Sequence, residues 1–134
     1  MLYTIAQGNV PTYQEGQGPV AHLVSTVQAV QEAGEQFVFT DGHATMAMSD
    51  FYEDVARMDL VDWPLMESRY WFDTQQYPDR KRRRQAELLV HRFFPWELVT
   101  TIGVLSEAMR ERVEAALADA EHRPVIQVRR DWYY

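Results

Sequence analysis

The sequence predicts an α+β fold in a single domain of 134 residues. Three observations lead to this prediction. Several short apolar runs are typical of strands, other segments carry apolar residues at helical spacing, and the two kinds do not alternate regularly. Apolar residues make up 46% of the chain and aromatic residues 13%, which is enough for a packed core. We therefore expect strands and helices mixed around one core, and not a doubly wound parallel sheet.

The first part of the chain is expected to form three short strands and one helical turn. One strand precedes residues 7–19, a loop rich in glycine and proline. Apolar runs predict two more strands at 20–24 and 36–40. Between them, residues 27–31 suit a helical turn that Gly34 would end, since glycine readily adopts the conformation that closes a helix.

Two helices are predicted in the middle of the chain. Over residues 45–58, apolar side chains recur at helical spacing and would form one buried face: Met48, Phe51, Tyr52, Val55 and Met58. A shorter helix is expected around 64–71, with Pro64 in its first turn. Residues 72–80 have no apolar period, which predicts a polar loop that leads into a basic run.

The last part of the chain is expected to contain three strands and a helix. The strands lie at 86–90, 98–105 and 124–130, and the helix precedes the last of them. Ser106 is placed to cap that helix. Its buried face would carry the residues that repeat at helical spacing: Met109, Val113, Leu117 and Ala120.

Composition and charge exclude several classes of protein. The chain has no cysteine, which excludes disulfides and thiolate nucleophiles. Its four histidines lack the spacing of metal ligands, so no metal site is expected. There is no basic leader, and no apolar run approaches the roughly 20 residues that cross a bilayer. We therefore expect a cytoplasmic protein without a membrane partner.

A basic run stands out in this acidic chain, whose net charge is −7. The net charge argues against a protein that coats nucleic acid by bulk attraction, but a local cationic strip can hold a few phosphates. Tyr77, in the preceding loop, could stack on a base, which is worth about 1–3 kcal/mol. The alternative is a solvated charge run without a ligand. The candidate DNA-binding cations are Arg80, Lys81, Arg82, Arg83 and Arg84.

Two side chains are candidates for catalysis. Glu87 stands at the start of the apolar run that follows the cations, and a rigid strand end fixes the direction of a side chain. His43 follows Asp41 and Gly42, where a sharp turn into the next helix would leave its imidazole free near the helix N-terminus. The alternatives are an exposed glutamate at a sheet edge, and a surface histidine behind a turn in which Asp41 is a helix cap.

In order and spacing, these strings resemble the DarT family over essentially the whole chain. The resemblance rests on residues 39–44, 51–52, 61–63, 71, 80–90 and 95–96. It implies an ADP-ribosyltransferase fold, a compact mixed sheet with flanking helices. It also implies that Glu87 is the catalytic carboxylate and that residues of about 72–86 form the substrate-recognition loop.

The resemblance further implies an activity and a partner. Members of the family use NAD as co-substrate and transfer ADP-ribose to thymidine bases in single-stranded DNA. They are toxins restrained by a macrodomain antitoxin, DarG. A further N-terminal segment, which supplies much of their NAD pocket, has no match here, so residues 1–134 are expected to be a truncated, C-terminal catalytic portion without assigned NAD-binding residues. The alternative is a truncated homologue that does not bind NAD and serves as a binding module for single-stranded DNA or the antitoxin.

Overall fold

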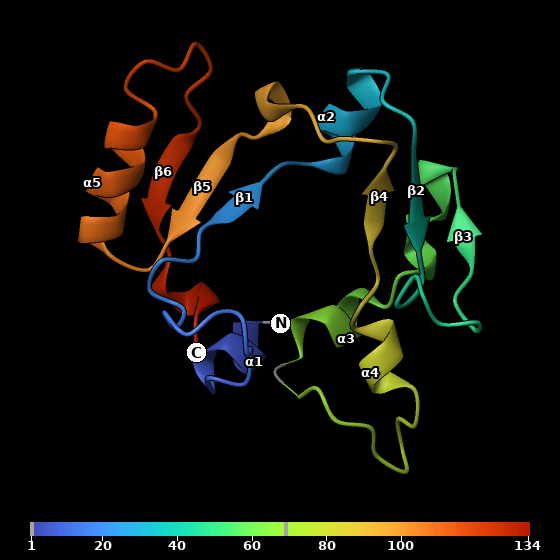
Figure 1. The fold of residues 1–134 in the computed structure, drawn as a ribbon. Coiled ribbons are helices and arrows are strands. Elements are labelled where there is room, and N and C mark those ends of the chain that lie inside the picture. Colours follow the sequence, from blue (N-terminus) through green and yellow to red (C-terminus); the bar gives the residue numbers. More distant parts are fainter. Residues whose placement is uncertain (1, 69) are drawn as a thin grey trace. The chain divides into compact units, whose positions relative to one another are not determined.

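The computed structural model describes residues 2–68 and 70–134 and shows helices and strands mixed along the chain (Figure 1). This confirms the predicted α+β class. The chain divides into two compact units, of which the first comprises Met1–Val30 and Pro95–Tyr134 and the second Gln31–Phe94. Among the described residues, the strands form two sheets of three strands each. The prediction that residues 1–134 act as one domain stays a prediction.

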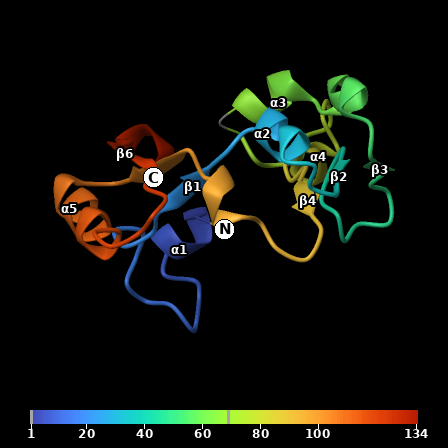
Figure 2. The same cartoon turned by 90° about the horizontal axis from the view of Figure 1, so that it is seen from above.

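The first unit is built on a mixed sheet with the order β1-β5-β6. Strand β5 (Thr101–Val104) runs antiparallel to β1 (His22–Val24) and parallel to β6 (Val125–Val128). Helix α5 (Glu107–Ala116) connects the two parallel strands and lies along β6 in both views of the ribbon (Figures 1 and 2). The side chain of Ser106 caps this helix, as predicted, by accepting a hydrogen bond from the N–H three residues later.

An apolar core holds α5 on this sheet. Val99, Ile102 and Val104 are each at most 2% exposed; Val99 lies just before β5, and the other two belong to it. The side chains packed around them come from the short 3₁₀ helix η2 (Trp96–Leu98), from α5 and its C-cap, and from β6: Trp96, Met109, Val113, Leu117, Ile126 and Val128. The predicted apolar face of the helix therefore packs against the core through three of its four residues, each of them partly buried.

The N-terminus of the chain differs from the prediction. The N-terminal residues form a helix, α1 (Leu2–Ala6), and the predicted starting strand is wrong. A short, mostly apolar segment fits either structure, and the described strands include no partner for it. The helix instead closes through Gly8, whose φ is +69°. The C-terminal η3 (Arg130–Trp132) follows β6.

The second unit contains an antiparallel sheet with the order β3-β2-β4. The central strand β2 (Phe37–Thr40) pairs with β3 (Phe51–Tyr52) on one side and with β4 (Leu88–Val90) on the other. Both β2 and β4 match predicted strands. Helix α2 (Val27–Glu32) precedes β2 and, as predicted, ends before Gly34, whose φ of +71° favours glycine.

The predicted helix over 45–58 is wrong. The structure has turns after residue 43, then strand β3, and then the 3₁₀ helix η1 (Val55–Leu60). Pairing with β2 places Tyr52 opposite Phe39, where their rings stack 5.2 Å apart, and this pairing removes the segment from any helix. Met48 is 74% exposed, so the expected buried face does not exist.

Two short helices bring the basic run towards β4. Helix α3 (Trp63–Glu67) confirms the helix predicted at Pro64 but ends before residue 71, because Ser68 is its extended C-cap; residue 69 lies outside the described residues. Asp62 caps α3 by accepting a hydrogen bond from a backbone N–H. The basic run itself forms helix α4 (Arg80–Arg83), where the sequence predicted a loop. Within residues 2–68 and 70–134, no helix is long and apolar enough to cross a membrane.

Candidate active site

Glu87 is the residue immediately before β4, and its backbone is held on both sides by Thr40. The Thr40 N–H donates to the Glu87 carbonyl at 2.9 Å, and the Glu87 N–H donates to the Thr40 hydroxyl at 3.0 Å. Thr40 is fully buried and its hydroxyl donates in turn to the carbonyl of Gly42 at 2.6 Å. This pairing fixes the backbone from which the Glu87 side chain projects, as expected for a strand end.

The structure brings the two predicted catalytic side chains together. His43 Nδ1 lies 2.9 Å from Glu87 Oε1, and each side chain is 35% exposed. The oxygens of an ionised Glu87 can only accept hydrogen bonds, so His43 Nδ1 carries the hydrogen atom and donates the hydrogen bond to Oε1. His43 Nε2 lies 3.3 Å from the Thr45 hydroxyl. The carboxylate is therefore oriented by a partner and still open to a ligand.

The surroundings of His43 differ from those predicted. A turn follows it in place of a helix, so the imidazole does not stand at a helix N-terminus, and it is not free. Its backbone is held at both polar atoms: the N–H donates to the Arg82 carbonyl at 3.0 Å, and the carbonyl accepts from the Ser49 hydroxyl at 2.8 Å. Gly42 makes this turn possible, because a Cβ there would lie 2.3 Å from Arg82 Nη1.

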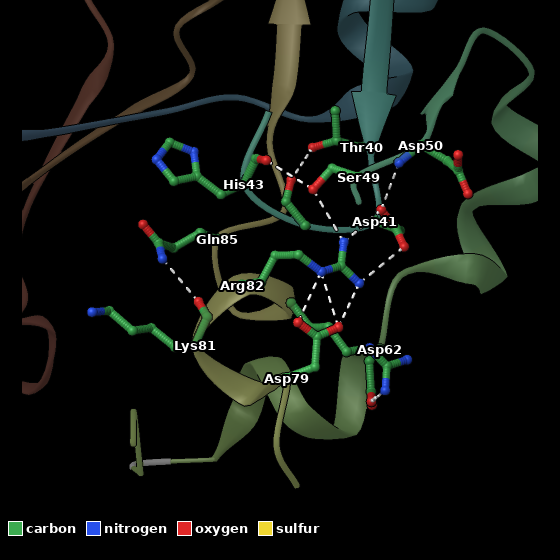
Figure 3. A network of polar contacts seen from close by, with 12 residues as sticks. Thr40, Asp41, His43, Ser49, Asp50, Asp62, Asp79, Lys81, Arg82 and Gln85 are labelled. Atoms are coloured by element: carbon green, nitrogen blue, oxygen red, sulfur yellow. Dashed lines mark hydrogen bonds and ion pairs between the residues drawn. The ribbon is translucent and has the colours of Figure 1, made fainter. Parts of the chain in front are cut away.

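Arg82 is the centre of a polar cluster of Asp41, Ser49, Asp79 and Arg82, which we call the Arg82 cluster (Figure 3). The guanidinium pairs with Asp79 at 2.7 Å and with Asp41 at 3.0 Å, and its side chain is only 10% exposed. The Ser49 hydroxyl accepts a further hydrogen bond at 3.1 Å. The structure therefore places this predicted DNA-binding cation between two carboxylates.

The contacts within the Arg82 cluster favour the charged forms of its side chains. Hydrogen bonds with Asp79 raise the pKa of the Arg82 guanidinium, although partial burial opposes this. Burial also raises the pKa of Asp41, but hydrogen bonds with Arg82 and with the Asp50 N–H outweigh it, and the pKa lies below the usual 3.8. Both groups are thus ionised near neutral pH. Neither Asp79 nor Ser49 was a candidate site residue from the sequence; only the i,i+3 spacing of Asp79 and Arg82 could have indicated the pair.

Lys81 and Arg80 face a different environment from Arg82. Lys81 is exposed, and its ammonium points away from Arg82 with no dashed contact drawn to it in Figure 3. The Arg80 guanidinium lies over the ring of Tyr77, 4.7 Å from its centroid, and also donates to the Ser68 hydroxyl at 3.2 Å. Tyr77 is 46% exposed. An exposed tyrosine beside a cation is the arrangement expected of a base-stacking site.

The two remaining cations of the run contact α3 and its flanks. Arg83 pairs with Asp62 at 3.1 Å and is 40% exposed. Arg84 donates to the Leu65 carbonyl at 3.0 Å, and its guanidinium lies 4.2 Å from the centroid of the Trp71 ring. Trp71 is 37% exposed. These cations hold the loop while part of their surface stays accessible.

Known relatives define the class of protein to which this site belongs. A DNA ADP-ribosyl transferase of Thermus sp. (strain 2.9) is 40% identical over 136 residues, which cover 100% of this chain and 63% of the relative. The structure of Thermus sp. 2.9 DarT in complex with NAD+ matches with a TM-score of 0.92 at 39% identity, over 99% of this chain and 66% of that one. Thermus sp. 2.9 DarT in complex with ADP-ribosylated single-stranded DNA matches with a TM-score of 0.93 at 38% identity, over 99% and 63%. The fold is that of a DNA ADP-ribosyltransferase.

The family follows from a match over the whole chain. The model described as "ssDNA thymidine ADP-ribosyltransferase, DarT" matches residues 1–134. The chain belongs to the DarT family, and the resemblance stated from the sequence is confirmed. It spans 63% of the length of the curated Thermus relative.

Proposed function

We propose that residues 1–134 act as a single domain, the catalytic portion of an NAD-dependent ADP-ribosyltransferase that modifies thymidine bases in single-stranded DNA. One observation carries the proposal: the Glu87 carboxylate stands on a rigid strand end, half-exposed and 2.9 Å from His43. Membership of the DarT family supports the reaction class. So do the complexes of the Thermus protein with NAD+ and with ADP-ribosylated single-stranded DNA.

The Glu87 carboxylate suits both halves of such a transfer. As the bond between ribose C1′ and nicotinamide breaks, nicotinamide leaves with the electron pair, and a nearby carboxylate stabilises the positive charge on the sugar. Glu87 then takes the proton from the thymine ring nitrogen, whose electron pair forms the new bond to C1′. General-base catalysis of this kind contributes about 10²–10⁴-fold. The products are ADP-ribosylated thymidine, nicotinamide and one proton.

His43 is the proposed catalytic partner of Glu87. Its Nδ1–H donates to Oε1, which leaves the other carboxylate oxygen for the substrate. The Thr45 hydroxyl near Nε2 holds the second ring nitrogen, so the imidazole plane is fixed from both sides. A carboxylate oriented in this way loses little entropy when the reacting groups meet.

Four of the five cations before Glu87, all except Arg82, are the proposed DNA contacts. Lys81 and Arg80 are the best placed, because the first is exposed and the second lies over the exposed Tyr77 ring. Arg83, at 40% exposure, and Arg84 extend the surface. Each phosphate contact on a single strand adds about 0.7 to the slope of log affinity against log salt concentration.

We also propose that the protein is the toxin of a toxin–antitoxin pair. Its partner would be a macrodomain antitoxin similar to DarG, and both would act in the cytoplasm. The support is family membership. Co-purification of the chain with such a macrodomain, and rescue of growth by the macrodomain, would be the direct measurements.

The decisive experiment mixes the purified chain with labelled NAD and a thymidine-containing oligonucleotide. We expect label on the oligonucleotide, none on a thymidine-free control, and a loss of about 10²–10⁴-fold in Glu87→Ala. Glu111→Ala, an exposed acid on α5, is the matched control and should keep full activity. Full activity in Glu87→Ala would refute the assignment.

Thermal stability separates the enzyme from the alternative binding module. A ligand at 100 times its dissociation constant stabilises the folded state by about 2.7 kcal/mol. We expect the melting temperature to rise with NAD concentration. A chain that binds single-stranded DNA but shows no such rise is the binding module.

A further inference from the structure

We propose that Arg82 is a positioning residue that holds His43 against Glu87, and that it does not contact DNA. Sequence alone grouped it with four neighbouring cations as a phosphate contact. Its catalytic consequence rests on the function proposed above, whereas its role in orienting His43 can be tested without any activity.

The guanidinium of Arg82 has no donor left for a phosphate. An arginine carries five N–H donors. Nε donates to Asp79 at 2.9 Å, Nη2 donates to Asp79 at 2.7 Å and to Asp41 at 3.4 Å, and Nη1 donates to Asp41 at 3.0 Å and to Ser49 at 3.1 Å. These five contacts use all five donors. The side chain is 10% exposed, so a phosphate would first have to displace Asp41 or Asp79 from the guanidinium.

The local charge points to the same conclusion. Asp41 and Asp79 together carry two negative charges against the single positive charge of Arg82. The Arg82 cluster therefore has a net negative charge and repels a phosphate. Lys81, the next residue, is exposed and is drawn with its ammonium directed away from the cluster (Figure 3). The neighbours in sequence thus face opposite electrostatic environments.

The cluster joins the predicted substrate loop to the turn that carries His43. Asp79 and Arg82 belong to α4 and its cap, whereas Asp41 and Ser49 flank the turn. The Arg82 carbonyl accepts from the His43 N–H, and the Ser49 hydroxyl, which accepts from Arg82, donates to the His43 carbonyl.

Gly42 shows how closely the two segments approach. A Cβ on Gly42 would lie 2.3 Å from Arg82 Nη1 and 3.0 Å from Arg82 Cγ. The arginine side chain thus lies directly on the turn. Any shift of Arg82 moves both backbone anchors of His43, and with them the 2.9 Å contact to Glu87.

Lysine cannot replace arginine in this arrangement. An ammonium has three donors at one point, and it cannot bridge two carboxylates and a hydroxyl in the plane that the guanidinium fork provides. At a phosphate contact, by contrast, lysine keeps the charge and most of the salt dependence. Arg82→Lys therefore distinguishes positioning from phosphate binding.

The experiment compares Arg82→Lys with Lys81→Gln in the 134-residue chain. For Arg82→Lys we expect kcat to fall about 10–100-fold, as for a misplaced catalytic group. KM for the oligonucleotide and the salt dependence of DNA binding should stay unchanged. For Lys81→Gln we expect KM to rise and the salt slope to fall by about 0.7, with kcat unchanged. A kcat equal to that of the wild type in folded Arg82→Lys would overturn the proposal, because lysine keeps the charge that a phosphate contact needs but not the geometry that positioning needs.

Two further measurements keep the test decisive. In ¹⁵N-histidine NMR spectra, the Nδ1 signal of His43 should report its hydrogen bond to Glu87 in the wild type and lose it in Arg82→Lys. This readout needs no activity, so an inactive wild-type chain would refute the proposed function and leave the positioning role measurable. Asp79→Asn, which keeps the arginine, serves if Arg82→Lys does not fold. It should lower kcat and change the same NMR signal, and an unchanged signal would overturn the proposal.

Discussion

The two three-stranded sheets are held to their surroundings by different forces. In the sheet β1-β5-β6, helix α5 packs on an apolar core in which Ile102 is 2% exposed and Val104 fully buried. In the sheet β3-β2-β4, the turn beyond Thr40 is joined to α4 by the ion pairs and hydrogen bonds of the Arg82 cluster. Apolar burial thus holds α5 on the first sheet, whereas polar contacts join the turn to α4 beside the second sheet, whose own Phe39 is also buried.

The difference follows from what each force can specify. The hydrophobic effect is non-directional and scales with the apolar area removed from water, so it stabilises packing without fixing a bond angle. Hydrogen bonds have strict distances and angles, and charge-assisted ones are stronger. The His43 imidazole, which lies 2.9 Å from the Glu87 carboxylate, therefore needs hydrogen bonds to hold its position.

The largest effect on stability is expected from the apolar core. Ile102→Ala removes buried methyl groups and leaves a cavity, which costs about 2–5 kcal/mol. Denaturant unfolding should show this loss. Because Ile102 lies in the unit without His43 and Glu87, kcat measured well below the melting temperature should stay near that of the wild type. A large fall in the kcat of fully folded Ile102→Ala would contradict the proposal that this core stabilises the fold without positioning His43 and Glu87.

A pair of glycine variants gives the sharpest comparison. An added methyl group at Gly42 would lie 2.3 Å from Arg82, and one at Gly103 would lie 2.2 Å from the Trp132 ring. Each substitution to alanine should cost about 1–3 kcal/mol by overpacking. Only Gly42→Ala should lower kcat, by about 10–100-fold, because only it displaces a catalytic turn.

The control for this pair is Gly18→Ala. An added Cβ there has no atom within 4 Å, and its stability should change by no more than about 0.5 kcal/mol. Equal losses of kcat in Gly42→Ala and Gly103→Ala would show that the apolar unit also positions the catalytic pair.

The smallest effect is a dependence of stability on pH through Asp41. Its pKa lies below 3.8 in the folded state, so its contribution to stability is present above the unfolded value and is lost as the pH falls through the folded value. Asp41→Asn should therefore be less stable than the wild type at neutral pH, and the gap should shrink below pH 3.8. Urea unfolding at several pH values measures it. The exposed Asp119→Asn should show no such gap, and a constant gap for Asp41→Asn would contradict the role of its charge.

Most of the secondary structure could be predicted from local pattern. The strands near 20–24, 36–40, 86–90 and 124–130 and the helix behind Ser106 are confirmed, because each combines an apolar run or period with a clear stop signal. The 45–58 helix failed because its apolar spacing also fits a short strand, and pairing of Tyr52 with Phe39 decided between them. Pairing depends on residues that lie elsewhere in the chain.

The sequence by itself determined the family, the α+β class and the two candidate catalytic residues, Glu87 and His43. Strings of residues in a fixed order carry that information without coordinates. Only the tertiary structure decided which cations of the basic run are accessible. Five adjacent positive side chains look alike along the chain, but a carboxylate 41 residues away pairs with Arg82 and buries it. Burial and ion pairing depend on neighbours in space, and these are set by the packing of the turn against α4.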